Sequence, residues 1–112
     1  MVGFRTPFSL GASVRDKVKT LSVAVQSLTQ LNWYFSAPVL KVAGNCPQLQ
    51  VHSATTGLWR TPVTITQINS MLIRASYGST VASPDAWQIL TTPVGLDPVV
   101  GDWVVPDAGT IP

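Results

Sequence analysis

Few residues in this chain could perform catalytic chemistry. Its 112 positions hold one His, one Cys and five acidic residues. A Ser-His-Asp site would have to use His52, yet no Gly-x-Ser-x-Gly turn accompanies it. A zinc site needs three or four His, Cys or carboxylate ligands, and phosphate or dinucleotide sites need glycine-rich loops that do not occur here. The sequence therefore predicts a non-enzymatic protein, with no catalytic residue, no cofactor and no metal ion.

Four tryptophans offer a second kind of chemistry, which is ligand binding. Large rings usually fill the cores of small β domains, but an exposed ring beside an Asp could stack on a sugar and leave the carboxylate to bind its hydroxyls. The candidate glycan contacts are Trp59, Trp87 and Trp103. A glycan- or receptor-binding module is therefore the alternative function to a purely structural one.

The composition favours permanent contacts with other proteins. Only 11% of the residues are charged, against about 25% in typical soluble proteins. All seven cations lie in 1–74 and four of the five Asp lie in 75–112, so the two ends differ in sign. The basic set is too small for a nucleic-acid binder. The uncharged window 20–40 contains too many polar residues for a membrane span, and the single Cys46 is expected to be a core residue.

The strongest pattern is a heptad spacing of apolar residues at the start of the chain. It predicts an amphipathic, coiled-coil-like helix over about 14–35, within an oligomerisation segment 13–37 that packs against copies of itself. Ser13 begins a capping box, and Pro38 disfavours continuation. A homotrimer is preferred over a dimer, and the alternative is a helix lying across its own sheet. The expected oligomer interface comprises Val14, Val18, Leu21, Val25, Leu28, Asn32 and Phe35.

After Pro38 the hydrophobic period changes to two. Alternation predicts strands near 48–55, 58–68, 71–77, 80–82, 87–92 and 99–105. The predicted fold class is therefore α+β, mainly β: one helix followed by a small antiparallel β domain over 38–112 with six or seven short strands, as in a sandwich or roll. The Pro-rich tail from about 93 is expected to be extended. An extended arm over 1–12 would dock on a partner through Phe4, Phe8 and Leu10.

An aromatic arm, a short heptad helix and a low-charge β domain rich in Thr, Ser and Val together resemble bacteriophage virion accessory proteins. Trimeric capsid decoration proteins and short fibre or spike proteins are of this type. The resemblance is one of type across the whole chain, without a shared motif, so no functional residue carries over from it. It implies a structural protein of the virion, assembled in the host cytoplasm, whose partners are itself and other capsid or tail proteins.

Overall fold

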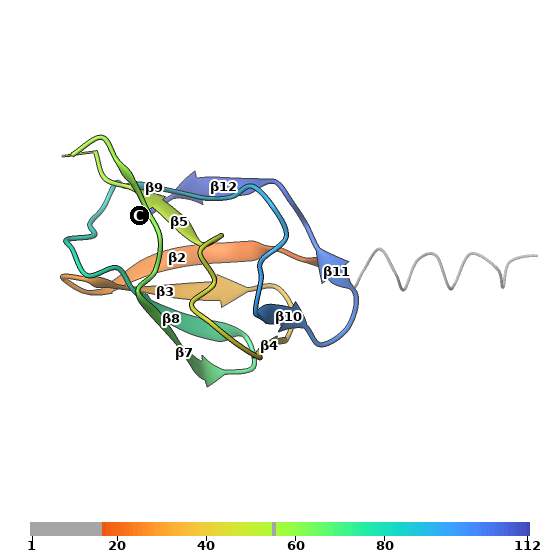
Figure 1. The fold of residues 1–112 in the computed structure, drawn as a ribbon. Coiled ribbons are helices and arrows are strands. Elements are labelled where there is room, and N and C mark those ends of the chain that lie inside the picture. The colour runs from red at the N-terminus through yellow and green to blue at the C-terminus, as the bar shows by residue number, and fades with distance from the viewer. Residues whose placement is uncertain (1–16, 55) are drawn as a thin grey trace, which may run out of the picture.

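The computed structural model describes residues 17–54 and 56–112, and within them every regular element is a β-strand (Figure 1). No helix in this part of the chain is long and apolar enough to cross a membrane. The twelve strands are β1 (Lys17–Val18), β2 (Thr20–Ser27), β3 (Gln30–Phe35), β4 (Val39–Lys41), β5 (Gln50–His52), β6 (Trp59–Arg60), β7 (Thr64–Asn69), β8 (Leu72–Ser76), β9 (Ala86–Ile89), β10 (Leu96–Pro98), β11 (Asp102–Trp103) and β12 (Asp107–Thr110).

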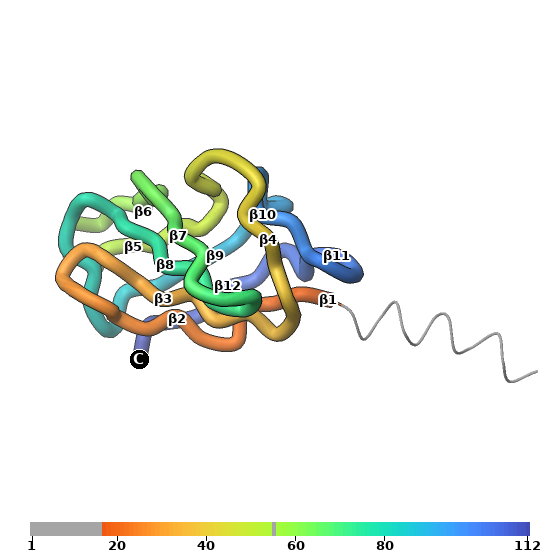
Figure 2. Tube along the Cα trace, turned by 90° about the horizontal axis from the view of Figure 1, so that it is seen from below, coloured from red at the N-terminus to blue at the C-terminus, as the bar shows by residue number. Residues whose placement is uncertain are grey.

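Two four-stranded antiparallel sheets form the body of the domain. One has the strand order β2-β3-β8-β7 and the other the order β12-β9-β5-β6. Two short ribbons complete the fold: β1 pairs in parallel with β11, and β4 pairs with β10. Figure 2 places β1 beside β11 at one end of the molecule. The domain is a β-sandwich with small ribbons added at its edges.

The core lies between the two sheets and is built around aromatic rings. Trp33 of β3 meets Trp87 of β9 edge to face, with ring centroids 5.5 Å apart. The Trp33 indole N–H donates to the Tyr77 hydroxyl, which itself donates to the Leu49 carbonyl. The polar groups of Trp33 and Tyr77 are therefore paired inside an otherwise apolar interior. The largest fully buried side chains are Trp33, Phe35, Leu31, Leu49, Ile73, Ile89, Leu96 and Ile111.

The predicted helix over 14–35 is wrong. Its described residues form β1 and the β2–β3 hairpin, whose strands turn at Leu28 and Thr29. A register shift between Thr20 and Ser22 is the physical reason why the sequence misled. Val18 and Thr20 are buried at even positions, and after the bulge the next buried residue is Val23. One extra residue in a strand shifts the buried positions from even to odd residue numbers. The alternation of apolar and polar residues is then interrupted, and the remaining spacing of apolar residues resembles a heptad.

The predicted fold class of α+β is therefore also wrong, because the described domain is all-β. Strands β5, β6, β8 and β11 fall inside predicted segments, and β7 and β9 each extend one residue beyond one, whereas no strand forms at 80–82. The tail from 93 supplies β10, β11 and β12, which pair with β4, β1 and β9. Leu96, Trp103 and Ile111 belong to the core, so the tail is an integral part of the sandwich. The arm 1–12 and Val14 lie outside the described residues.

Candidate functional site

The residues expected to form a helical seam are divided between the interior and the surface. Val18 and Phe35 are fully buried inside the sandwich. Leu21, Val25 and Leu28 are exposed, by 62%, 45% and 78% respectively. The described members of the predicted interface therefore do not form one continuous stripe. They come from the β2 edge, the β2–β3 turn and the core.

Asn32 lies on the outer face of its sheet, where it organises a small polar cluster. Its amide nitrogen donates to the Gln26 side-chain oxygen at 2.9 Å, and its oxygen accepts from Nε of Arg74 at 3.0 Å. Asn32 and Arg74 are paired across β3 and β8, so the register holds the two side chains together. The buried amide is thus satisfied by neighbours in its own sheet, which replaces the interhelical role that the sequence predicted.

The open edge of the first sheet is the most extended feature that could bind another chain. β2 is eight residues long and carries no charge, and among the described residues it pairs with β3 alone. Beyond its pairing with β3, its described backbone makes one hydrogen bond, from the Thr20 N–H to Oδ2 of Asp107 at 2.8 Å. A long, uncharged edge strand is a ready template for strand addition, and natural proteins usually block such edges with charge or cover.

A shallow groove separates the β2 edge from the β12 edge of the opposite sheet. Its volume is about 390 Å³, and it is lined by Thr20, Leu21, Ser22, Trp87, Asp107, Ala108, Gly109, Thr110 and Pro112. Oγ1 of Thr20 is the one buried side-chain polar atom without a hydrogen-bond partner in the described part of the chain. The groove therefore combines apolar walls, a carboxylate and two strand edges.

Two of the three candidate glycan contacts are core residues. Trp87 and Trp103 are each 5% exposed. Trp103 packs edge to face on Phe35 at 5.4 Å, and its indole N–H donates to the Leu96 carbonyl. Neither ring can stack on a sugar at the surface without leaving the core. Of the three predicted glycan contacts, Trp59 therefore remains as the candidate.

Trp59 is 45% exposed and lies against the His52 ring, with centroids 4.9 Å apart. Both residues come from adjacent strands of the second sheet, where His52 is paired with Trp59 across β5 and β6. On the next strand pair, Gln50 lies opposite Gln88, and the Gln88 amide donates to the Gln50 oxygen at 2.8 Å. These four side chains, termed the β5 platform, place aromatic and amide groups on two neighbouring strand pairs.

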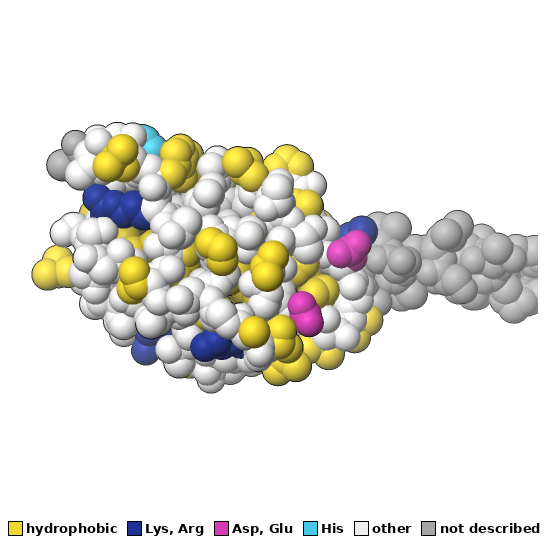
Figure 3. Space-filling view, viewed as in Figure 1, with side chains coloured by type: hydrophobic (Ala, Val, Ile, Leu, Met, Phe, Trp, Pro, Cys, Tyr) yellow, Lys and Arg dark blue, Asp and Glu magenta, His cyan; other side chains and the backbone are white. Residues whose placement is uncertain are grey.

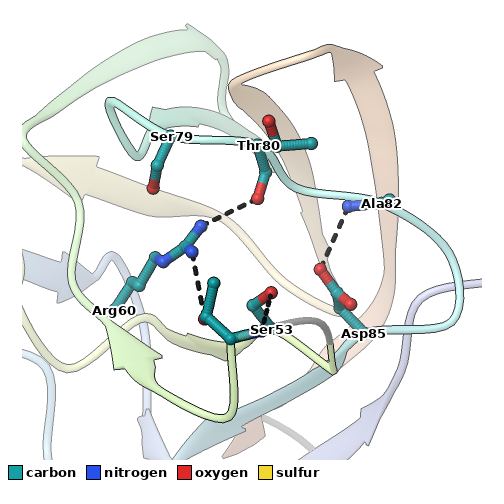
Figure 4. A pocket seen from close by; sticks show the side chains of 7 residues that line it. Ser53, Arg60, Ser79, Thr80, Ala82 and Asp85 are labelled. Atoms are coloured by element: carbon teal, nitrogen blue, oxygen red, sulfur yellow. Dashed lines mark hydrogen bonds between the residues drawn. The ribbon is translucent and has the colours of Figure 1, made fainter.

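A pocket of about 350 Å³, which includes Arg60 and Asp85 in its lining, lies between the β5–β6 turn and the loop that follows β8 (Figure 4). The Arg60 guanidinium donates to the Thr80 carbonyl at 2.8 Å and to the Thr56 hydroxyl at 3.2 Å. The buried Asp85 carboxylate accepts from the backbone N–H groups of Ala54 and Ala82. Both charged side chains hydrogen-bond to neighbouring loops. The pocket is therefore a place where loops are held together, which is a structural role.

The buried thiol and the buried phenol, which could act as nucleophile or base, are held in their neutral forms. Burial raises the pKa of the Cys46 thiol to about 11. Burial also raises the pKa of Tyr77, whose hydroxyl is fixed between Trp33 and Leu49. A protonated, buried thiol is a poor nucleophile. Within the described ranges no three His, Cys, Asp or Glu residues gather as a metal site.

No protein-family model and no curated protein matches this chain. Its fold is similar to that of surface layer protein SbsC, domains 1–6, with a TM-score of 0.67 and 16% identity over 95% of this chain and 15% of the other. It is also similar to the N-terminal part of the bacterial S-layer protein SbsC, with a TM-score of 0.60 and 18% identity over 85% of this chain and 23% of the other.

The chain therefore spans less than a quarter of the length of either S-layer structure, and at these identities the likeness is one of fold. It corrects the resemblance to bacteriophage virion accessory proteins, which is wrong because the structural neighbours are S-layer domains. The absence of a helix in the described residues removes the feature on which that resemblance most depended.

Proposed function

We propose that this chain is a non-enzymatic structural domain of a cell-surface assembly, which works by associating with copies of itself. The observation that carries the proposal is the fold, a β-sandwich similar over 95% of this chain to part of a surface-layer protein. That neighbour is a surface layer protein, and a structural role at a cell surface would suit this domain.

The character of the surface supports this proposal. Fifteen large hydrophobic side chains of the described residues are exposed, and charged residues are few. Figure 3 shows one face on which apolar side chains are scattered among neutral polar ones, with few charged groups between them. Such a surface has weak charge repulsion between copies, which favours lasting contacts.

The chemistry of the interior also supports a non-enzymatic role. The Cys46 thiol and the Tyr77 hydroxyl are buried, and Arg60 and Asp85 bind protein groups. Hydroxyl groups line the pocket with Asp85 and the groove with Asp107, but among the described residues no hydrogen bond joins such a hydroxyl to either carboxylate. A structural role requires only a stable fold and a surface that binds neighbouring copies of the chain.

Light scattering on the purified chain over a range of concentrations tests the proposal. The expected result is a mass that rises from the 12.0 kDa of one chain toward a dimer or trimer as concentration increases. A trimer is preferred, and a dimer would serve the same role. A mass that stays at one chain throughout the range would contradict self-association as the mode of action.

A second candidate function is glycan binding at the β5 platform. The observation that favours it is the exposed Trp59 ring beside His52, with Gln50 and Gln88 on the next strand pair. Aromatic rings bind the apolar faces of sugars, and side-chain amides bind their hydroxyls.

Tryptophan fluorescence during titration with cell-wall polysaccharide tests this candidate. Trp59→Ala should abolish the response, whereas Leu58→Ala, which alters a neighbouring exposed apolar residue, should preserve it. Equal responses from the two variants would rule out the β5 platform as the glycan site.

A further inference from the structure

The two outer strands of the β2-β3-β8-β7 sheet differ in how well they are covered. At β7, the Gln67 side chain donates to the Val39 carbonyl and accepts from the Lys41 N–H, while the Lys41 ammonium donates to the Ile65 carbonyl. β4 therefore covers much of the β7 edge. β2 has one such cover, the bond from Thr20 to Asp107, at its first residue. The exposed edge of this sheet is therefore the rest of β2, over 21–27.

Exposed apolar side chains lie along this free edge, so covering it would be favourable. Leu21 and Val25 are exposed along β2, and Leu28 is exposed at its end. The groove between β2 and β12 adds the side of Trp87 and the small residue Gly109. Its volume of about 390 Å³ is within the range of pockets that hold ligands or large side chains.

The chain itself contains a segment whose pattern suits this site. An extended chain over residues 2–10 would place Val2, Phe4, Thr6, Phe8 and Leu10 on one face. The opposite face has Gly3, Arg5, Pro7 and Ser9. This is the period of a strand with one apolar face. Pro is compatible with an edge position, and an added strand is by definition an edge strand.

We propose that residues 2–10 of a second copy of this chain bind as an added strand along the free edge of β2, with Phe4 or Phe8 entering the groove beside Trp87. This inference rests on the proposed self-association and names its contact. Backbone hydrogen bonds to β2 would supply affinity, and the alternating side chains would supply specificity, as in other cases of strand addition.

The length of the chain before β1 allows a second copy to supply this strand. Lys17 and Val18 pair in parallel with β11, and Val18 is fully buried. The chain then runs on into β2 in the same direction, from the end of the molecule marked by β1 and β11 (Figure 2). The sixteen preceding residues could extend about 50 Å at about 3.3 Å per residue, which is enough to reach a neighbouring domain.

Light scattering on the full chain and two variants tests this proposal. Phe4→Ser combined with Phe8→Ser should weaken self-association by roughly ten- to a hundredfold, because the ring that fills the groove is lost whichever of the two enters it. Leu58→Ser combined with Val94→Ser is the matched control, since it removes two exposed apolar residues away from the groove and should leave the association unchanged. Near-ultraviolet circular dichroism verifies that each variant keeps the native core.

The outcomes separate this inference from the proposed function. If the Phe variant associates like the unmodified chain, the strand-addition site is wrong, and self-association through another surface still stands. If the unmodified chain is monomeric at every concentration, both proposals fail. If only the Phe variant becomes monomeric, the inference is supported.

Cross-linking decides which copy supplies the strand. Chains with Ser9→Cys are mixed with chains carrying Ser22→Cys and treated with a short bismaleimide; the unmodified chain, whose Cys46 is buried, is the control. A covalent dimer that contains both variants supports the proposal. A third sample contains chains that carry both substitutions. A cross-link that forms within these chains, and not between the two single variants, would overturn the assignment to a second copy.

Discussion

Replacing Gly109 with Ala should destabilise the domain, although Ala is ordinarily the better strand residue. Gly109 lies directly opposite Trp87 in the β12–β9 pair. A Cβ atom at this position would lie 2.6 Å from Cζ2 of Trp87 and 2.8 Å from its Nε1. These distances are far below van der Waals contact, so the indole ring or the β12 backbone must move.

The magnitude follows from three effects. Overpacking a core position costs about 1–3 kcal/mol. Displacing Trp87 would also disturb its edge-to-face contact with Trp33, which contributes about 0.5–1.5 kcal/mol. Removing a glycine from a strand returns about 0.5–1 kcal/mol. The net expectation is a loss of about 1–3 kcal/mol, or a fall in melting temperature of roughly 4–8 °C for each kcal/mol.

Urea unfolding followed by tryptophan fluorescence measures this loss for Gly109→Ala. Thr110→Ala, an exposed change in the same strand, is the matched control and should alter the free energy of unfolding by less than about 0.5 kcal/mol. Combining Gly109→Ala with Trp87→Phe should cost less than the sum of the two single changes, because the smaller ring relieves the clash. A Gly109→Ala variant as stable as the unmodified chain would refute the proposed contact between β12 and the core.

Three further predictions concern buried polar groups. Thr20→Val should leave stability unchanged or raise it by about 1 kcal/mol, because it removes a buried hydroxyl that lacks a partner among the described residues; calorimetry measures this. Stability should fall as pH rises from about 9 to about 11, by roughly 2–3 kcal/mol for Cys46, because its folded pKa exceeds the unfolded value of 9.0 and the unfolded thiol ionises first. That share of the pH dependence should vanish in Cys46→Ala, measured by urea unfolding at each pH. Asn32→Ala should cost about 1–3 kcal/mol in the same assay, since Gln26 and Arg74 each lose a partner.

The sequence allowed part of the fold to be predicted, and one local irregularity accounts for the main error. Alternation located β8, whose buried residues Ile73 and Ala75 keep a period of two, and it also indicated the segments around β5 and β7, which have one buried residue each. The bulges in β2 break that period, so Leu21, Val25 and Leu28 matched a heptad by coincidence. A strand with bulges and a short amphipathic helix are difficult to distinguish by spacing alone.

The candidate sites were less predictable, because they depend on pairing between distant segments. The groove joins β2 to β12, which are separated by most of the chain. Which edge of the sheet stays unpaired depends on how all four strands pair, and the local sequence of β2 does not determine that pairing. The β5 platform was partly accessible, since Trp59 was recognised as a candidate contact, whereas the burial of Trp87 and Trp103 was decided by the way the two sheets face each other.

Hydrogen–deuterium exchange at two protein concentrations tests most directly whether the domain associates through the β2 edge. The account predicts that peptides from 20–27 exchange more slowly in the concentrated sample, where an added strand would protect their outward N–H groups. Peptides from 64–69 serve as the internal reference and should exchange equally in both samples, since β4 already covers that edge. Equal exchange of the 20–27 peptides in dilute and concentrated samples would contradict association through β2.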